Sequence, residues 1–292
     1  MMNRVIPSLL ALVAAVCLLC GVAVAEESAP LLPIDFTGGS VPMPEGYVGD
    51  WEYQDPTIHV KVVQERVDQC DYWVADIKLA DASQLRTMSA GGFDSNRVTA
   101  GTVMANRVNA VLAIDGDYFC YTGKGYIVRQ GEEYLNILEG DRDVLLVDED
   151  GDFHPVIAPA AGAFDGTING KKVINAFYFG PVLVMNGEVV QEVTGQDMSA
   201  TDKRQRMCIA QVGPLEYKAI CCAGPARGSY GMTLQQFANL VAQQGVQTAY
   251  NLDGGDSTMM IFKGEKINDV RNHATRQISD IIYFASAWEN QE

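Results

Sequence analysis

The stretch YNLDGGDST, residues 250–258, carries an apolar strand directly into an acidic, glycine-rich loop. The stretch LAIDGDYF, residues 112–119, has the same arrangement earlier in the chain. Ligands commonly bind at the ends of sheet strands, because a rigid scaffold holds the loops there. Glycines let the backbone approach a ligand, and a carboxylate beside them can accept from sugar hydroxyls, act as acid or base, or bind a cation. Each loop is therefore a candidate ligand site, although an Asp-Gly pair taken alone is more often a turn.

Strand patterns dominate the sequence around these loops. Residues 58–67 alternate apolar and polar side chains, and residues 110–114 are a continuous apolar run typical of a buried strand. Asn186-Gly187 is a hairpin turn signal. The clearest helix is expected between Thr233, a capping residue, and Gly245, which ends it. Strands outnumber helices by about three to one, which predicts an α+β fold with a mixed β-sheet core and a few covering helices in a single domain.

The N-terminus has the pattern of a secretory signal peptide over residues 1–25. Arg4 precedes an apolar run, and Ala23-Val24-Ala25 forms a small-x-small cleavage site. An uncleaved membrane anchor is the alternative. Residues 26–50, rich in proline, glycine and acids, predict a flexible spacer, and residues 51–292 a domain. We therefore expect a secreted or cell-surface protein that meets the membrane only through an uncleaved anchor.

Charge and cysteine content limit the partners. The 292 residues carry a formal net charge of −16, which argues against nucleic acid, since phosphate backbones attract Lys and Arg. The three histidines are scattered and none lies near a cysteine, so zinc is not expected. Neighbouring cysteines in a strand point to opposite faces and are poor disulfide partners. The five cysteines beyond residue 25 are therefore expected to be mostly buried apolar residues, with at least one unpaired: Cys70, Cys120, Cys208, Cys221 and Cys222.

Several segments, in this order and spacing, resemble the phosphodiester glycosidase family. They are Asp115 to Phe119, Phe179 to Gly187, Arg206 in its strand, Gly231 to Leu234, Asn251 to Ser257, and Arg276 to Asp280. The LDGG and FGP…NG segments are the specific part, and the resemblance covers roughly Trp51 to Phe284. It implies an α+β domain and an enzyme that cleaves between a sugar's anomeric carbon and a phosphate oxygen. A bacterial member would act on a glycosyl-phosphodiester or polysaccharide of an envelope or host glycan.

The resemblance also implies roles for individual residues. Asp253 would be the catalytic carboxylate, as nucleophile, base or oxocarbenium stabiliser. Arg206 and Arg276 would clamp the phosphate, a task suited to the planar guanidinium group. Asp115, the fourth catalytic candidate, would bind sugar hydroxyls or a cation. Gly254, Gly255 and Ser257 would supply amide and hydroxyl donors, and the complete set of substrate-binding candidates is Asp117, Tyr118, Gly254, Gly255, Asp256 and Ser257.

Two acids depart from the family pattern. Asp115 stands where the first motif often has asparagine, and Asp256 stands where the LDGG loop often continues with glycine. Both add negative charge to a pocket meant for an anion. A divalent cation such as Ca²⁺ could bridge carboxylates and phosphate there. The candidate metal ligands are Asp115, Asp117 and Asp256, and the sequence leaves the cofactor otherwise unknown.

Two other functions remain open. The segment Asn251 to Gly254 resembles the DxDG motif of haloacid-dehalogenase phosphatases, but their nucleophilic first aspartate is Asn251 here. The stronger alternative is a non-catalytic cell-surface glycan-binding module on the same fold. Release of sugar, release of phosphate, or binding without turnover would distinguish the three.

Overall fold

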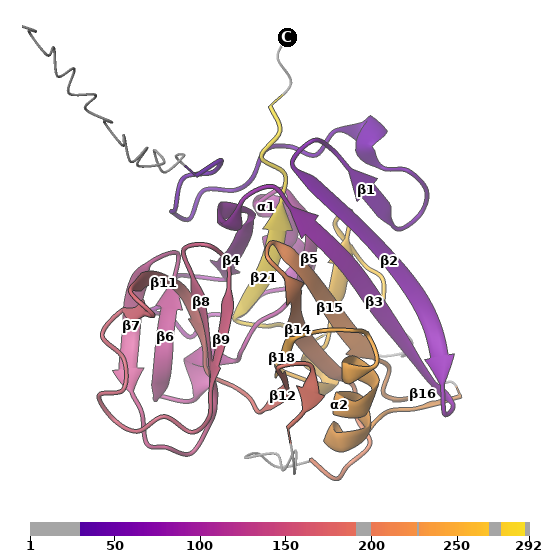
Figure 1. Ribbon diagram of the computed structural model, residues 1–292. Helices are drawn as coiled ribbons and strands as arrows, with labels where there is room; N and C mark the ends of the chain where they lie inside the picture. Colours follow the sequence, from indigo (N-terminus) through magenta and orange to yellow (C-terminus); the bar gives the residue numbers. More distant parts are fainter. Residues whose placement is uncertain (1–29, 191–199, 227, 269–275, 290–292) are drawn as a thin grey trace, which may run out of the picture.

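The computed structural model describes residues 30–190, 200–226, 228–268 and 276–289 (Figure 1). The predicted signal peptide or anchor, residues 1–25, lies outside the described residues. Among the described residues, no helix is both long and apolar enough to cross a membrane. The described chain is rich in β-structure, with α-helices only at α1 (Gly101–Arg107) and α2 (Leu234–Ala242). Four short 3₁₀ turns lie in the connections between elements: η1 (Pro44–Gly46), η2 (Ala82–Gln84), η3 (Phe119–Tyr121) and η4 (Gly255–Ser257).

The largest sheet has eight strands. In spatial order they are β1 (Glu52–Gln54), β2 (Ile58–Val67), β3 (Cys70–Leu79), β15 (Glu216–Cys222), β14 (Arg206–Gly213), β18 (Thr248–Asn251), β12 (Val182–Met185) and β13 (Glu188–Val189). The predicted turn at Asn186-Gly187 joins β12 to β13, and both residues have positive φ angles, as such a hairpin requires.

A second sheet of five strands packs against the first. Its order is β20 (Glu265–Lys266), β19 (Met260–Phe262), β5 (Ala110–Asp115), β21 (Asp280–Ala285) and β4 (Leu85–Ser89). The third sheet has six strands: β7 (Glu132–Ile137), β6 (Gly125–Arg129), β11 (Lys171–Phe177), β8 (Val144–Asp148) and β9 (Phe153–Val156), with β10 (Thr167–Ile168) paired to β11. A small hairpin pairs β16 (Pro225–Ala226) with β17 (Ser229–Tyr230).

Every strand pairing within the described residues is antiparallel, so the predicted mixed sheet is wrong. Neighbours such as β2 and β3, or β14 and β15, are joined by tight turns. Parallel neighbours would need crossover connections of about a dozen residues or more. The predicted β-rich character and the few covering helices are confirmed.

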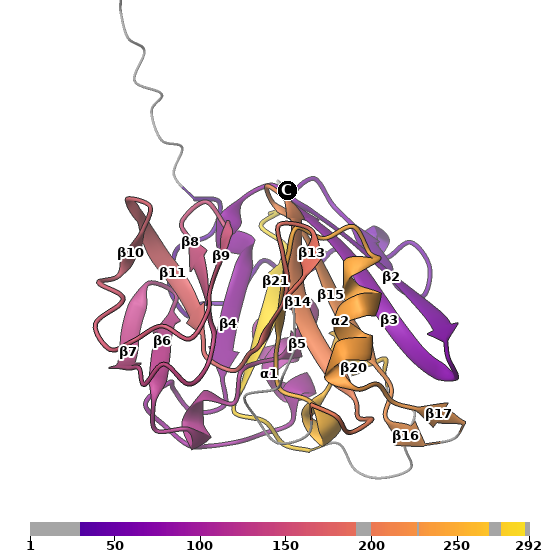
Figure 2. The ribbon, with the colours of Figure 1, turned by 60° about the horizontal axis from the view of Figure 1, so that its bottom comes forward.

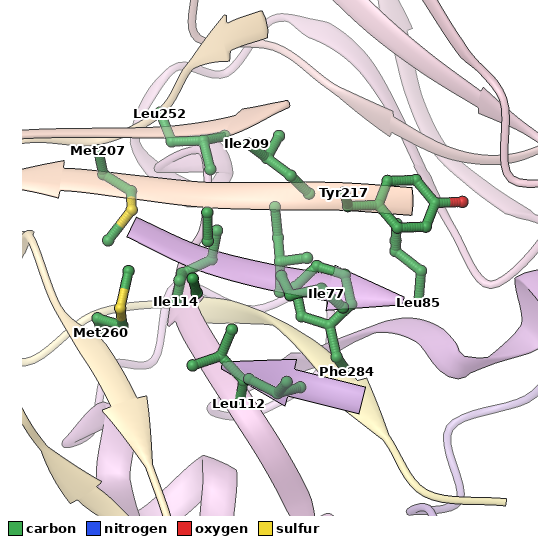
Figure 3. Packing of buried hydrophobic residues seen from close by; sticks show 14 of the residues in the cluster. Ile77, Leu85, Leu112, Ile114, Met207, Ile209, Tyr217, Leu252, Met260 and Phe284 are labelled. Carbon is green, nitrogen blue, oxygen red and sulfur yellow. The ribbon is translucent and has the colours of Figure 1, made fainter. Parts of the chain in front are cut away.

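The main core lies between the eight-stranded and five-stranded sheets (Figure 3). Met207 and Ile209 of β14 face Ile114 of β5 and Met260 of β19 there. The alternate residues of β14 point to the opposite face, which α2 covers (Figure 2). Because both faces of β14 are buried, its sequence reads as a continuous apolar run. Thr233 caps α2 with the predicted reciprocal hydrogen bonds to Gln236.

The predicted flexible spacer over residues 26–50 is wrong for residues 30–50, which pack on the domain. Arg86 of β4 is fully buried, and its guanidinium donates to the backbone oxygens of Pro33 (2.9 Å), Asp35 (2.9 Å) and Thr37 (2.9 Å). A buried guanidinium needs acceptors, and the N-terminal segment supplies them. Leu32 is buried in the same region. The composition of the segment did not reveal this distant partner.

Candidate active site

Three acidic strand ends from two sheets meet at one place. Asp115 ends β5, Asp280 begins β21, and Asp253 lies just beyond β18 of the other sheet. The amide of Gly116 donates to the carbonyl of Asp280 (3.2 Å), and the amide of Asp253 donates to the carbonyl of Gly116 (3.2 Å). These backbone bonds fix the three segments to one another. Gly116 is required because a Cβ there would overlap the Asp280 carboxylate.

The predicted site residues other than Asp117 line two adjoining hollows. A small pocket of about 10 Å³, room for about one water molecule, is lined by the carboxyls of Asp115, Asp253 and Asp280. An open cleft of about 610 Å³ lies beside it, and Arg206 is on its wall. Asp253, Arg276 and Tyr118 line both hollows. Of the four catalytic candidates, Asp115 lines the pocket, Arg206 lines the cleft, and Asp253 and Arg276 line both.

Asp253 stands at the junction of pocket and cleft. Its Oδ1 accepts a hydrogen bond from the amide of Gly254 (2.8 Å). Burial raises the pKa of Asp253, while the Ser257 hydroxyl, the Gly254 amide and the Arg276 guanidinium act in the opposite direction. A half-buried carboxylate with a neighbouring cation is suited to act on a bound substrate as nucleophile or base.

Asp115 is fully buried beside Asp253. Its Oδ1 accepts from the amide of Met259 (2.8 Å), and its Oδ2 has no hydrogen-bond partner among the described residues. Burial raises the pKa of Asp115 well above its ordinary value, and the negative charge of Asp253 raises it further. Asp115 is therefore held toward its neutral form, in which it can donate a hydrogen bond into the pocket.

Asp280 is a candidate site residue that sequence reasoning missed. It is buried, its Oδ1 accepts from the Ser279 hydroxyl (2.8 Å), and its Oδ2 lies 3.8 Å from Nη2 of Arg129. Burial and the charge of Asp117 raise the pKa of Asp280 to about 7, against the opposing effect of Arg129. The available signal was an acid at the head of the apolar run IIYFA, residues 281–285.

The structure contradicts a direct substrate- or metal-binding role for Asp117. Asp117 is fully buried behind the pocket, and one of its oxygens accepts from Nη2 of Arg129 (2.8 Å). The other oxygen accepts from the amide of Tyr178 (2.8 Å). Both oxygens of Asp117 therefore accept hydrogen bonds from the six-stranded sheet and its margin, and neither is left for a ligand. Sequence reasoning could not see Arg129 as a buried partner, because an arginine in a strand reads as exposed.

The three candidate metal ligands do not form a site. Asp117 is bound to Arg129, Asp256 is exposed on η4, and Asp115 lies buried in the pocket. Across the described part of the chain, no group of three or more His, Cys, Asp or Glu side chains could hold a metal ion. The expected Ca²⁺ site at Asp115, Asp117 and Asp256 thus lacks its ligand set.

The amides of Gly254 and Gly255 are bonded to other groups of the protein, whereas we expected them to donate to the substrate. The amide of Gly254 donates to Asp253, and the amide of Gly255 donates to the carbonyl of Gln205 (3.1 Å). These bonds anchor the loop against the start of β14. Gly254 and Gly255 line the cleft, but their amide donors are already committed. Ser257 is buried and lines the small pocket with its hydroxyl beside Asp253.

The two arginines differ in environment. Arg206 is buried, and its guanidinium donates from Nε to the carbonyl of Met232 (3.2 Å) and from Nη2 to the carbonyl of Asp202 (2.9 Å). Arg206 thereby holds the cleft wall together. Arg276 is exposed at the mouth, 5.8 Å above the ring of Tyr118, which stacks on Tyr121 at 4.2 Å. Arg276 is therefore the better placed of the two to meet an anionic ligand.

The substitution Asp280→Asn is expected to change how stability depends on pH. The pKa of Asp280, about 7 in the folded state, lies above the ordinary 3.8, so the folded protein retains a proton that the unfolded chain releases. The stability due to this proton is fully present below about pH 4 and is lost as the pH rises through about 7. Asparagine stays neutral at every pH. Between about pH 4.5 and pH 8 the free energy of unfolding should therefore fall by on the order of 2–4 kcal/mol less in the variant than in wild type.

Urea denaturation at about pH 4.5 and pH 8 checks this difference. Asp256→Asn is the matched control, because Asp256 is exposed on the same side of the molecule. Parallel pH profiles for wild type and Asp280→Asn would show that Asp280 is ionised throughout this range.

A guanidinium, three buried or half-buried carboxyls and aromatic rings thus meet at the strand ends of a β-rich fold, a combination suited to an anionic, hydroxyl-bearing ligand. The chain belongs to the phosphodiester glycosidase family: the family model matches residues 108–285, which include every site residue described above. No curated protein matches the sequence.

Solved structures share the fold. The catalytic domain of zebrafish N-acetylglucosamine-1-phosphodiester alpha-N-acetylglucosaminidase, described as auto-inhibited by its pro-peptide, is similar with a TM-score of 0.62 and 18% identity, over 85% of this chain and 87% of that one. A hypothetical protein from Synechocystis has a TM-score of 0.51 and 16% identity, covering 78% and 62% of the two chains. A Burkholderia pseudomallei protein described as exported has a TM-score of 0.51 and 13% identity, covering 74% of each.

Proposed function

We propose that this protein is an exported hydrolase that cleaves the bond between a sugar's anomeric carbon and phosphate in a glycosyl-1-phosphodiester. The observation that carries the proposal is the position of Asp253, whose carboxylate stands where the small pocket opens into the cleft, with Arg276 at the mouth. A carboxylate and a guanidinium on one cavity match the two charges that such a reaction develops.

The charge requirements of the reaction agree with these residues. The departing group is a phosphate monoester of the other alcohol, whose oxygen is already acidic, so it needs less protonation than an ordinary alcohol. The positive charge at the anomeric carbon requires a carboxylate, the role that we assign to Asp253 as nucleophile, base or electrostatic stabiliser. Asp115, held toward its neutral form, can donate to a sugar hydroxyl or to a water in the pocket without opposing the phosphate charge. This answers how a site with added acids can accept an anion.

We assign phosphate binding to Arg276, and we assign to Arg206 the task of holding the cleft wall on which the phosphate rests. Tyr118 supports the Arg276 guanidinium from below. The stacked face of Tyr118 and Tyr121 offers an apolar surface to one side of a sugar ring. The name of the zebrafish enzyme makes an N-acetylglucosamine-1-phosphodiester the first substrate to test.

The protein is proposed to act outside the cytoplasm, on an envelope or host glycan. Support comes from the signal-peptide pattern of residues 1–25 and from the exported description of the Burkholderia protein. Fractionation of cells producing the full chain would test this: recovery in the cytoplasm with residues 1–25 still attached would contradict export.

The activity itself is tested by incubating the purified full chain with a GlcNAc-1-phosphodiester and measuring free sugar. Release of the sugar with the phosphate left on the other alcohol supports the proposed hydrolase. Release of inorganic phosphate would instead favour a phosphatase. Binding without either product would favour the glycan-binding module.

Arg276→Gln is expected to raise KM for the phosphodiester by about 10- to 100-fold with a smaller change in kcat. A charge-assisted hydrogen bond to phosphate contributes about 1.5–3 kcal/mol, and about 1.4 kcal/mol corresponds to tenfold. Arg276→Lys should recover part of the loss. Arg107→Gln, which removes one exposed positive charge at the end of α1 and outside both hollows, is the control and should leave KM within about twofold. An unchanged KM in Arg276→Gln would remove Arg276 from phosphate binding.

A further inference from the structure

Two buried thiols are cross-strand neighbours on the face of the eight-stranded sheet that α2 covers. Cys222, the last residue of β15, pairs with Tyr72 of β3. Cys70 lies two residues before Tyr72, so its side chain points to the same face and is a diagonal neighbour of Cys222. Both side chains are buried in the cluster beneath α2, and each lies close enough to the other to affect its pKa.

The surroundings favour reaction at Cys70. The Ser229 hydroxyl donates to the Cys70 sulfur at 3.6 Å. The hydrogen bonds from Cys222 and Ser229 lower the pKa of Cys70 to about 7 despite its burial. Burial raises the pKa of Cys222. Cys70 is therefore the thiol that carries a thiolate fraction near neutral pH, and the thiolate is the nucleophile in disulfide exchange.

We propose that Cys70 and Cys222 form an intramolecular disulfide when the chain folds in contact with an external disulfide. Before the strands pair, the Cys222 thiolate attacks one sulfur of that reagent and expels the other as a thiolate, which leaves a mixed disulfide. As β3 and β15 pair and the hydrogen bonds around Cys70 form, the Cys70 thiolate attacks the Cys222 sulfur and expels the second half of the reagent. Two protein thiols are oxidised by two electrons, the external disulfide is reduced to two thiols, and the two protein protons pass to these products.

The other cysteines of the described chain are less well placed. Cys208 lies on the same face, two residues from Arg206, which pairs with Cys222, but burial raises the pKa of its thiol. The two diagonals of a twisted sheet are not equivalent, so one neighbour can touch while the other does not. Cys221 points to the opposite face, into the core between the sheets.

The disulfide would connect the β2–β3 hairpin to the cleft wall. The Cys222 sulfur lies 3.5 Å from the carbonyl oxygen of Arg204, and Cys222 pairs with Arg206 in the sheet. Both arginines line the cleft. The bond thus fixes, from behind, the segment that forms one wall of the candidate active site, whatever substrate that site accepts.

The test refolds the full chain from urea in a buffer of oxidised and reduced glutathione. A Cys17→Ser/Cys20→Ser background removes the N-terminal thiols. Free thiols are alkylated, and the unreduced protein is digested for mass spectrometry. We expect a peptide containing Cys70 linked to one containing Cys221 and Cys222. The link should vanish in Cys70→Ser and Cys222→Ser but persist in Cys221→Ser and in the matched buried control Cys208→Ala.

The linked protein should also melt roughly 5–15 °C above its reduced form, a difference that Cys70→Ser should abolish. Three outcomes would overturn the proposal: alkylated Cys70 and Cys222 in folded, unreduced protein; a link that survives Cys222→Ser; or a stable glutathione adduct on Cys70 in place of the internal bond. None of these readouts depends on the glycosidase activity, so the two proposals fail separately.

Discussion

Asp253→Asn is expected to lower kcat for a glycosyl-1-phosphodiester by roughly 10³-fold or more, with the fold intact. Asparagine keeps the shape of the side chain and an oxygen that can accept from the Gly254 amide, so the loop retains its anchor. What is lost is the negative charge beside the anomeric carbon and the ability to act as nucleophile or base. These contributions exist mainly in the transition state, so the loss falls on kcat more than on KM.

The same substitution makes a separate prediction about stability. The folded state raises the pKa of Asp253, so the ionised carboxylate costs stability above its ordinary pKa, and asparagine removes that cost. We therefore expect Asp253→Asn to melt at the wild-type temperature or above it near neutral pH. Asp50→Asn, which changes an exposed acid that lines neither the pocket nor the cleft, is the control and should keep activity within a few-fold. A normally folded Asp253→Asn protein with near wild-type turnover would exclude Asp253 from the chemistry.

The sequence could predict which strands end at the site because burial leaves a local pattern. The apolar run of β5 and the apolar residues before the loop at Asp253 are hidden within sheets, and acids directly after them mark strand ends. Two such ends are far apart in the chain, and their meeting followed only from the family resemblance. The structure supplies the physical link, the backbone bonds that join Gly116 to Asp280 and to Asp253.

The sequence could not predict which charged residues are buried, because each depends on a distant partner. Arg86 reads as an exposed strand residue until the backbone oxygens of residues 33–37 are placed around it. Asp117 reads as a ligand-binding acid until Arg129 is seen against it. The prediction of parallel strand pairs in a mixed sheet was wrong for a related reason. The direction of a strand relative to its neighbour is set by long-range pairing, which the local sequence pattern does not show.

Arg129→Met is expected to lower the free energy of unfolding by about 3–5 kcal/mol. Arg129 is fully buried, pairs with Asp117 at 2.8 Å, and its guanidinium lies 4.6 Å from the ring centre of Phe177 and 5.3 Å from that of Phe93. Methionine can fill much of the volume, but it leaves the Asp117 carboxylate buried without its cation. It also removes the positive charge that opposes the raised pKa of Asp280.

A double-mutant cycle separates the charge pair from packing. Asp117→Asn removes the charge but keeps an oxygen that can accept from the Tyr178 amide. The double variant Arg129→Met/Asp117→Asn should therefore be at least about 2 kcal/mol more stable than the sum of the single losses predicts, because neither unpaired charge remains. Urea denaturation with an unchanged m-value measures all three variants. Additive losses would mean that Arg129 acts through its aromatic contacts and that the site's buried carboxyls do not depend on its charge.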